Sequence, residues 1–252
     1  MDRTVICMKW GKLYGPDYVN VLFNATRANL PGEFRFVCLT DDAEGIDGGV
    51  ECLPIPDMGL REDLWRIGAW PKISLFSKDL HGLRGRALFI DLDMVIWGNL
   101  AEFFTRGTGL IAVDEGRWSG NAPSTMSSIM AFDLGRLDYL VDRLREDCGG
   151  VAQRHGLEQR YIHEMVDDIG YWPESWLVSF KRHLRRPVLI DRFLQPKQPA
   201  PGTKIVIFHG RPRPFDLIRP GGDNRGVWPH HIPGSVDWMR DYWTRNGGTL
   251  SV

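Results

Sequence analysis

The chain has 252 residues, of which 43% are hydrophobic and 25% charged, enough for the core of one large globular domain. Its net charge of −1 at pH 7 gives no basic surplus for a nucleic-acid partner, so we expect none. No apolar stretch reaches the ~18 residues that a membrane-spanning helix needs. The four cysteines show no CxxC spacing, and the first strand pattern begins too early to leave room for a leader, so we expect a cytoplasmic protein with reduced thiols.

Short apolar runs rich in β-branched residues alternate with helical spacings along most of the chain. In order, the runs predict strands at 4–8, 34–39, 50–55, 87–97, 109–113, 127–132 and 204–208. Helical spacing predicts helices at 16–29, 71–79, 137–147, 157–167 and 236–243. The strand–helix–strand opening implies parallel pairing. We therefore predict a single α/β domain with a Rossmann-like, mainly parallel central sheet flanked by helices, whose ligand lies beyond the carboxyl ends of the strands.

Asp91 and Asp93 interrupt the most apolar of these runs, at 87–97. We expect this run to be a strand buried on both faces. Two unpaired carboxylates in such a place would cost several kcal/mol each, so a positive group must meet them. A lone acid at a strand end is usually a helix cap or an ion-pair partner, but a closely spaced pair favours a divalent cation such as Mn²⁺ or Mg²⁺.

Other polar groups also follow predicted strands, at Lys9, at residues 40–42 and at His209. Because the carboxyl ends of parallel strands meet at one edge of a sheet, we expect these groups to lie near Asp91 and Asp93. Imidazole suits Mn²⁺ as well as carboxylate does, so His209 is a candidate third ligand beside Asp91 and Asp93. The alternative for His209 is an ordinary hydrogen-bonded structural role.

The segment from Phe89 to Val95, with its Asp-x-Asp core, resembles the DxD motif of GT-A nucleotide-sugar glycosyltransferases, especially the retaining glycogenin-like and bacterial galactosyltransferase-like group. In that family the DxD acids hold a Mn²⁺ that bridges a nucleotide diphosphate, and a late histidine completes the metal set. His209, followed by Gly210 and Arg211, resembles that late element. The resemblance therefore implies a metal site formed by Asp91, Asp93 and His209.

Further segments extend the resemblance over residues 4–214. Lys72 resembles the family's basic residue upstream of DxD, which reaches the sugar or the phosphates, although a solvated helix lysine is the alternative. Residues 127–133 resemble the strand beside the donor sugar. Glu158 and Gln159 resemble a helix start that faces the reacting centre, so we take them, with Lys72, as catalytic candidates; a helix-start charge is the alternative for Glu158. Glu158 replaces the family's Asp, and Ser127 and Ser128 replace its NSG sequence.

The donor-binding residues are expected along the same edge. Trp10 and Tyr14 are placed to stack on or border the base, and Asp41 or Asp42 is placed to accept hydrogen bonds from uracil or ribose. Packing and a simple turn are the alternatives. The residues that we expect to contact the donor are Met8, Lys9, Trp10, Tyr14, Asp41, Lys72, Asp91, Leu92, Asp93, His209, Gly210 and Arg211.

We predict one domain over residues 1–252. Residues 1–100 form its nucleotide-binding half, ending in the DxD strand; residues 101–214 form the donor-sugar and acceptor half, and 215–252 an extension. We predict a Mn²⁺- or Mg²⁺-dependent glycosyltransferase that moves a hexose from a UDP-sugar to a glycan, lipid-linked sugar or polysaccharide acceptor, with retention. The alternatives are a sugar nucleotidyltransferase, a DxD aspartyl phosphatase and a non-catalytic nucleotide-sugar binding protein.

A basic run occupies residues 181–186, where five of six side chains are Lys, Arg or His. The ordinary explanation is a solvated helix end. The alternative is a patch that meets an anionic acceptor or an acidic membrane, which would place the chain peripherally at the inner face of that membrane.

Overall fold

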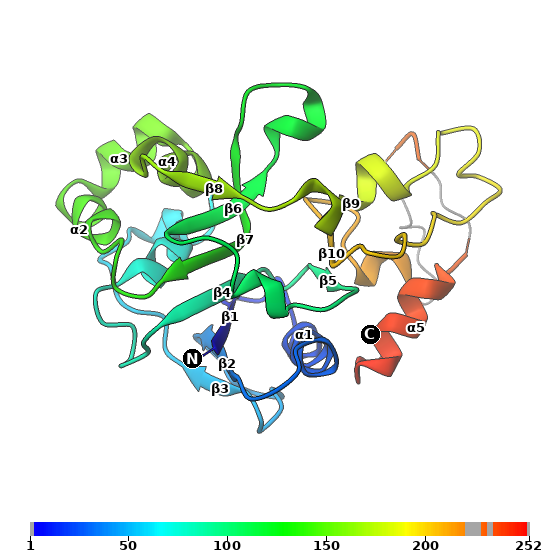
Figure 1. The fold of residues 1–252 in the computed structure, drawn as a ribbon, viewed down its shortest axis with the longest axis horizontal. Helices are drawn as coiled ribbons and strands as arrows, with labels where there is room; N and C mark the ends of the chain where they lie inside the picture. The colour runs from blue at the N-terminus through cyan, green and yellow to red at the C-terminus, as the bar shows by residue number, and fades with distance from the viewer. Residues whose placement is uncertain (1–2, 220–227, 231–233, 251–252) are drawn as a thin grey trace.

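The computed structural model describes residues 3–219, 228–230 and 234–250. Its centre is a seven-stranded sheet in the order β3-β2-β1-β4-β7-β6-β8. The sheet is parallel from β3 to β4, and β7 runs antiparallel to both of its neighbours, β4 and β6. Helices flank this sheet (Figure 1), so the predicted α/β class and the mainly parallel sheet are confirmed.

The strands of the central sheet are β1 (Arg3–Lys9), β2 (Arg35–Thr40), β3 (Glu51–Leu53), β4 (Arg86–Ile90), β6 (Leu110–Asp114), β7 (Thr125–Asp133) and β8 (Ile169–Tyr171). The α-helices are α1 (Pro16–Asn29), α2 (Tyr139–Glu146), α3 (Cys148–His155), α4 (Glu158–Met165) and α5 (Asp237–Arg245). Helix α1 has the bounds that its spacing predicts, with Pro16 at its first position and Asp17 in its first turn.

Alternate residues of the central strands build two separate cores, as the period of a strand requires. Val5 and Cys7 of β1 face α1 and belong to one core, which extends to α5. Ile6 and Met8 face the other way, into a core that includes α2 and α4. Both faces of β1 are therefore buried, which explains why parallel strands of this sheet appear in the sequence as continuous apolar runs.

A second, three-stranded sheet has the order β5-β10-β9, with β5 (Val95–Ile96), β9 (Leu177–Ser179) and β10 (Ile205–Ile207). The prediction of one strand over 87–97 is therefore wrong. Strand β4 ends at Ile90, a turn closed by Met94 N donating to Asp91 O follows, and β5 leaves for the second sheet. Because the chain turns here, the carboxylates of Asp91 and Asp93 are not part of a fully buried strand, where water could not reach them.

The last predicted strand, at 204–208, is confirmed as β10 but does not join the central sheet. It pairs antiparallel with β5 and parallel with β9, a strand that the sequence pattern did not reveal. The expected helix at 71–79 is a 3₁₀-helix, Trp70–Phe76. The basic run begins in a π-helical turn, Phe180–Leu184, and its last two residues, Arg185 and Arg186, lie beyond that turn, where we expected a helix end.

No helix in the described part of the chain is long and apolar enough to cross a membrane. The predicted extension at 215–252 is described only at 215–219, 228–230 and 234–250, where α5 packs its buried Trp238, Met239 and Trp243 against the first core. The rest of that prediction lies outside the described residues.

Gly98 allows the close approach of the chain after β5 to the chain before β10. Its N–H donates to Lys204 O at 3.0 Å, and a β-carbon at this position would lie 2.7 Å from the carbonyl oxygen of Thr203. We expect Gly98→Ala to lower the free energy of unfolding by about 1–3 kcal/mol, because backbone must move. Urea unfolding measures this, with Gly48→Ala as control, since a β-carbon there meets nothing within 4 Å. Equal losses in both variants would contradict the assignment.

Candidate functional site

A cavity of about 530 Å³ opens beyond the carboxyl ends of β1 and β4. Seven of the residues predicted to contact the donor line this cavity: Met8, Trp10, Tyr14, Lys72, Asp91, Leu92 and Asp93. The other residues of its wall, which the sequence did not single out, are Gly11, Lys12, Leu13, Trp65, Arg66 and Ala69. The strand-end rule therefore located the cavity correctly.

A buried ionic cluster forms one wall of the cavity. The Lys72 ammonium donates to Asp91 Oδ2 at 2.7 Å and lies 3.8 Å from Glu158 Oε1. The Ser127 hydroxyl donates to Glu158, and Lys72 and Glu158 are only 7% and 4% exposed. The solvated-helix alternative for Lys72 is therefore wrong, because this lysine is the counter-ion of the first DxD acid.

Burial and charge act against each other in this cluster. Burial raises the pKa of Asp91 and of Glu158, and Lys72 opposes both effects. Burial alone would lower the pKa of Lys72, but Asp91 and Glu158 outweigh it and raise that pKa. Lys72 is thus held as an ammonium in a low-dielectric wall, where a charge-assisted hydrogen bond to an anionic ligand is strongest.

The second DxD acid has no cationic hydrogen-bond partner among the described residues. Asp93 instead accepts from the Tyr14 hydroxyl at 2.8 Å. Burial first, and then the charge of Asp91, raise the pKa of Asp93 to about 7, which Tyr14 and Lys72 only partly oppose. Burial also raises the pKa of Tyr14, whose ring stacks beneath the guanidinium of Arg213 at 5.1 Å. Among the described residues, Asp91 and Asp93 thus have only one neighbouring lysine, Lys72, so this part of the cavity wall has too little positive charge to balance both acids.

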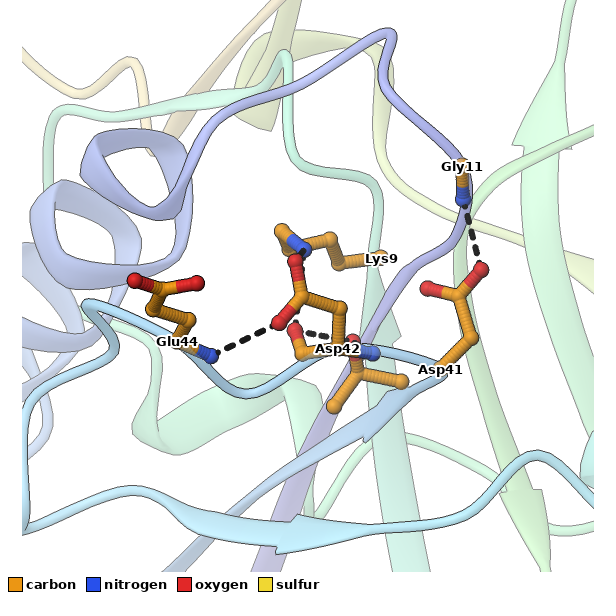
Figure 2. Close-up of polar contacts among 6 residues, drawn as sticks. Lys9, Gly11, Asp41, Asp42 and Glu44 are labelled. Atoms are coloured by element: carbon orange, nitrogen blue, oxygen red, sulfur yellow. Dashed lines mark hydrogen bonds and ion pairs between the residues drawn. The ribbon is translucent and has the colours of Figure 1, made fainter.

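The loop after β1 is fixed by hydrogen bonds from the loop after β2. Asp41 Oδ2 accepts from Gly11 N at 2.9 Å, and Figure 2 shows the Lys9 side chain directed at Asp42. Lys9 donates to Asp42 O at 2.9 Å and lies 3.5 Å from its carboxylate, and only 3% of Lys9 is exposed. Neither Lys9 nor Asp41 lines the cavity; both hold the loop that does.

Trp10 and Trp65 form the apolar side of the cavity. Trp10 Nε1 donates to Trp65 O at 2.9 Å, which fixes the indole ring at the cavity wall. Flat aromatic rings beside a polar floor are suited to a base or a sugar. Trp65 was missed because it belongs to a 3₁₀-helix, Glu62–Trp65, without strand or helix periodicity.

A strained bend connects the cavity to the start of α4. Ala69 has φ 52°, in the left-handed region that a non-glycine residue avoids, and it lines the cavity beside Lys72. Gly68 O, just before it, accepts from Glu158 N at 3.1 Å. The bend thus ties Lys72 and Glu158 to one backbone junction; Gln159 lies half-buried in the first turn of α4. In the sequence, only the turn signal of Gly68 could have indicated this bend.

His209 lies beyond β10, against a different set of neighbours. Its Nε2 is 2.8 Å from the Ser179 hydroxyl, and Trp118 stacks on its ring at 6.3 Å. Burial, together with Lys181 and nearby arginines, lowers the pKa of His209 to about 4, which keeps the imidazole neutral. Gly210 and the exposed Arg211 follow it and do not line the cavity.

The structure thus pairs Asp91 with Lys72 and Asp93 with Tyr14, but it does not gather His209 with the two acids. Within residues 3–219, 228–230 and 234–250, no group of three or more His, Cys, Asp and Glu side chains is placed to hold a metal ion. The predicted three-ligand set stays a prediction.

Two solved structures that share this arrangement of elements are glycosyltransferases. The galactosyltransferase LgtC, solved with donor and acceptor sugar analogs, is similar to 99% of this chain over 97% of its own length, with a TM-score of 0.65 and 13% identity. The glycosyltransferase GlyE of Streptococcus pneumoniae TIGR4 is similar to 99% of the chain over 62% of its own length, with a TM-score of 0.60 and 11% identity. No protein-family model and no curated sequence matches the chain. The chain therefore has the GT-A glycosyltransferase fold that its DxD segment resembles.

The pKa of Asp93 predicts a pH dependence of stability. Burial and the charge of Asp91 raise the pKa of Asp93 in the folded chain from its ordinary value of 3.8 to about 7, so between these values the folded chain binds more protons than the unfolded chain. The metal-free protein should therefore lose stability as the pH rises from about 4 to 7, by on the order of 4 kcal/mol from this group. Urea unfolding at several pH values measures it. Asp93→Asn should remove this part of the slope, and parallel pH profiles for both proteins would contradict the prediction.

Proposed function

We propose that the chain is a glycosyltransferase that uses a nucleotide diphosphate sugar, with a UDP-sugar as the expected donor. The observation that carries this proposal is the cavity at the end of β4, with Asp91, Asp93 and Lys72 in its wall. The shared fold with sugar-transferring enzymes supports it.

A divalent cation suits the donor set of this wall. Asp91 and Asp93 offer hard carboxylate oxygens, and burial together with the neighbouring charge of Asp91 raises the pKa of Asp93, an effect that a bound cation would oppose. In the proposed metal set, Mn²⁺ or Mg²⁺ would be held by Asp91 and Asp93, with the neutral His209 as third ligand. When bound, such an ion supplies Lewis-acid stabilisation of the diphosphate leaving group.

The side chains around the acids suggest their own roles. Lys72, an ammonium kept charged by two carboxylates, would donate to a phosphate oxygen or a sugar hydroxyl. Glu158, oriented by Ser127, and Gln159 beside it would face the sugar. Trp10 and Tyr14 would border the base, where their rings form one side of the cavity. Asp91 and Asp93 would thus serve both donor binding and sugar transfer.

The proposed acceptor is a glycan, lipid-linked sugar or polysaccharide, and the proposed stereochemistry is retention. We further propose that a cytoplasmic chain reaches a membrane-bound acceptor through the basic run at 181–186. The product anomer, determined by nuclear magnetic resonance, distinguishes retention from inversion.

Metal-dependent UDP binding tests the core of the proposal. In calorimetric titrations, Mn²⁺ should strengthen UDP binding to the wild type by roughly tenfold or more, and Asp93→Ala should abolish that gain. Asp241→Ala, an exposed acid on α5, is the matched control and should behave as the wild type. The same UDP affinity with and without Mn²⁺, in wild type and Asp93→Ala alike, would refute the metal-diphosphate assignment.

The strongest rival is a sugar nucleotidyltransferase, because the glycine-containing loop at residues 11–15 contributes to the cavity wall. The released product distinguishes the two reactions. Incubation with UDP-, GDP- and dTDP-sugars and Mn²⁺ should release a nucleoside diphosphate, with the UDP-sugar as the preferred substrate. Release or consumption of pyrophosphate would favour the rival instead.

A further inference from the structure

Two hydrogen bonds close the base of the loop that follows the basic run. Lys197 N donates to Leu184 O at 2.9 Å, and Arg186 Nε donates to Gln195 O at the same distance. Between these two bonds residues 187–194 form consecutive turns, in which Ile190 N and Asp191 N both donate to Pro187 O. We call residues 187–194 the docking loop. In Figure 1 the yellow part of the ribbon after β9 projects at the opposite end of the view from α2, α3 and α4.

The docking loop has the reverse of the usual burial pattern. Its one acid, Asp191, is 0% exposed and pairs with His230, so the polar side chain anchors the loop from inside. Its large apolar side chains point outward: Leu189 is 77% and Phe193 80% exposed, and Ile190 and Leu194 are also exposed. Single exposed apolar residues are ordinary, but four in six consecutive positions form an apolar tip whose exposure to water is unfavourable.

Positively charged residues flank this apolar tip in the sequence. Residues 181–197 contain six Lys and Arg and one acid, the buried Asp191. Arg182, Arg192 and Lys197 are exposed, and none of them forms an ion pair within the part of the chain that the structure describes. Trp228, two residues before His230, is also largely exposed. Exposed apolar side chains in a segment with unpaired cations match the boundary between lipid headgroups and acyl chains.

We propose that the docking loop inserts into the interface of a bilayer rich in anionic phospholipid, while Arg182, Arg192 and Lys197 contact the headgroups. The cations attract the anionic surface, and burial of Leu189, Ile190, Phe193 and Leu194 then holds the loop there. A second copy of this chain is the less suitable occupant. In a symmetric contact between two copies, the two positively charged segments would face each other at close range without acids between them.

This surface adjoins the late loop of the candidate site. The Lys181 ammonium lies 3.4 Å from the position that a β-carbon at Gly210 would occupy, directly after His209. Docking would thus bring the loop that begins at His209 toward the lipid headgroups, where a lipid-linked acceptor presents its sugar. That consequence rests on the proposed function, whereas membrane binding itself needs neither donor nor acceptor.

Vesicle co-sedimentation of the full chain tests the proposal. The wild type should bind phosphatidylcholine vesicles that contain roughly one-third phosphatidylglycerol, bind pure phosphatidylcholine far more weakly, and lose binding as salt is raised. Leu189→Ser/Phe193→Ser and Arg192→Glu/Lys197→Glu should each bind about tenfold more weakly. Ile67→Ser and Lys78→Glu, exposed residues outside the loop, are the controls for lost apolar surface and reversed charge, and should bind as the wild type.

Circular dichroism and UDP titration of the same variants show whether fold and donor binding are intact. Normal UDP affinity together with weak vesicle binding in both loop variants supports the proposal. Equal binding to both kinds of vesicle, or full binding by both loop variants, would overturn it. So would a wild type that does not bind vesicles but forms a dimer that the apolar substitutions dissociate. A wild type that binds vesicles but not UDP would refute only the proposed function.

Discussion

The ion pair between Lys72 and Asp91 is the interaction on which the candidate site depends. It joins the 3₁₀-helix Trp70–Phe76 to the end of β4 through two groups that are mostly removed from water. Glu158 shares the same ammonium from the start of α4. Removal of Lys72 would leave two carboxylates buried without a counter-ion, at a cost of about 3–5 kcal/mol. The lysine therefore keeps three elements together and keeps its own charge at the same time.

The charge balance of this wall supports the proposed cation. Asp91 and Glu158 are paired with a single Lys72, while burial first and the charge of Asp91 next raise the pKa of Asp93, which Lys72 only partly opposes. A nucleotide diphosphate would add more negative charge to the same cavity. The cavity wall also contains Lys12 and Arg66, and in the proposed function a hard divalent ion would add positive charge directly beside Asp91 and Asp93.

The sequence predicted the central sheet well because its signals are local. Continuous apolar runs mark β1, β2 and β4, and Pro16 marks the start of α1. Asp91 and Asp93 were singled out because their residue type carries its own chemistry, and both line the cavity at the strand ends. Lys9 and Asp41 show the limit of that reasoning. Polar residues at strand ends bind a ligand or hold a loop, and only the three-dimensional contacts distinguish Lys9 bonded to Asp42 from a residue in the cavity wall.

The two-sheet arrangement, which no local pattern revealed, decides where His209 lies. The turn that carries Asp91 and Asp93 leads directly into β5, and β10 pairs antiparallel with β5, Val206 opposite Val95. Strand β10 therefore runs back toward the turn with the two acids, and its end delivers His209 to the same side of the molecule without a place in the central sheet. There His209 Nε2 meets the Ser179 hydroxyl. A metal ion at the proposed site would compete with Ser179 for this one nitrogen, so the strength of that hydrogen bond would set how readily His209 becomes a third ligand.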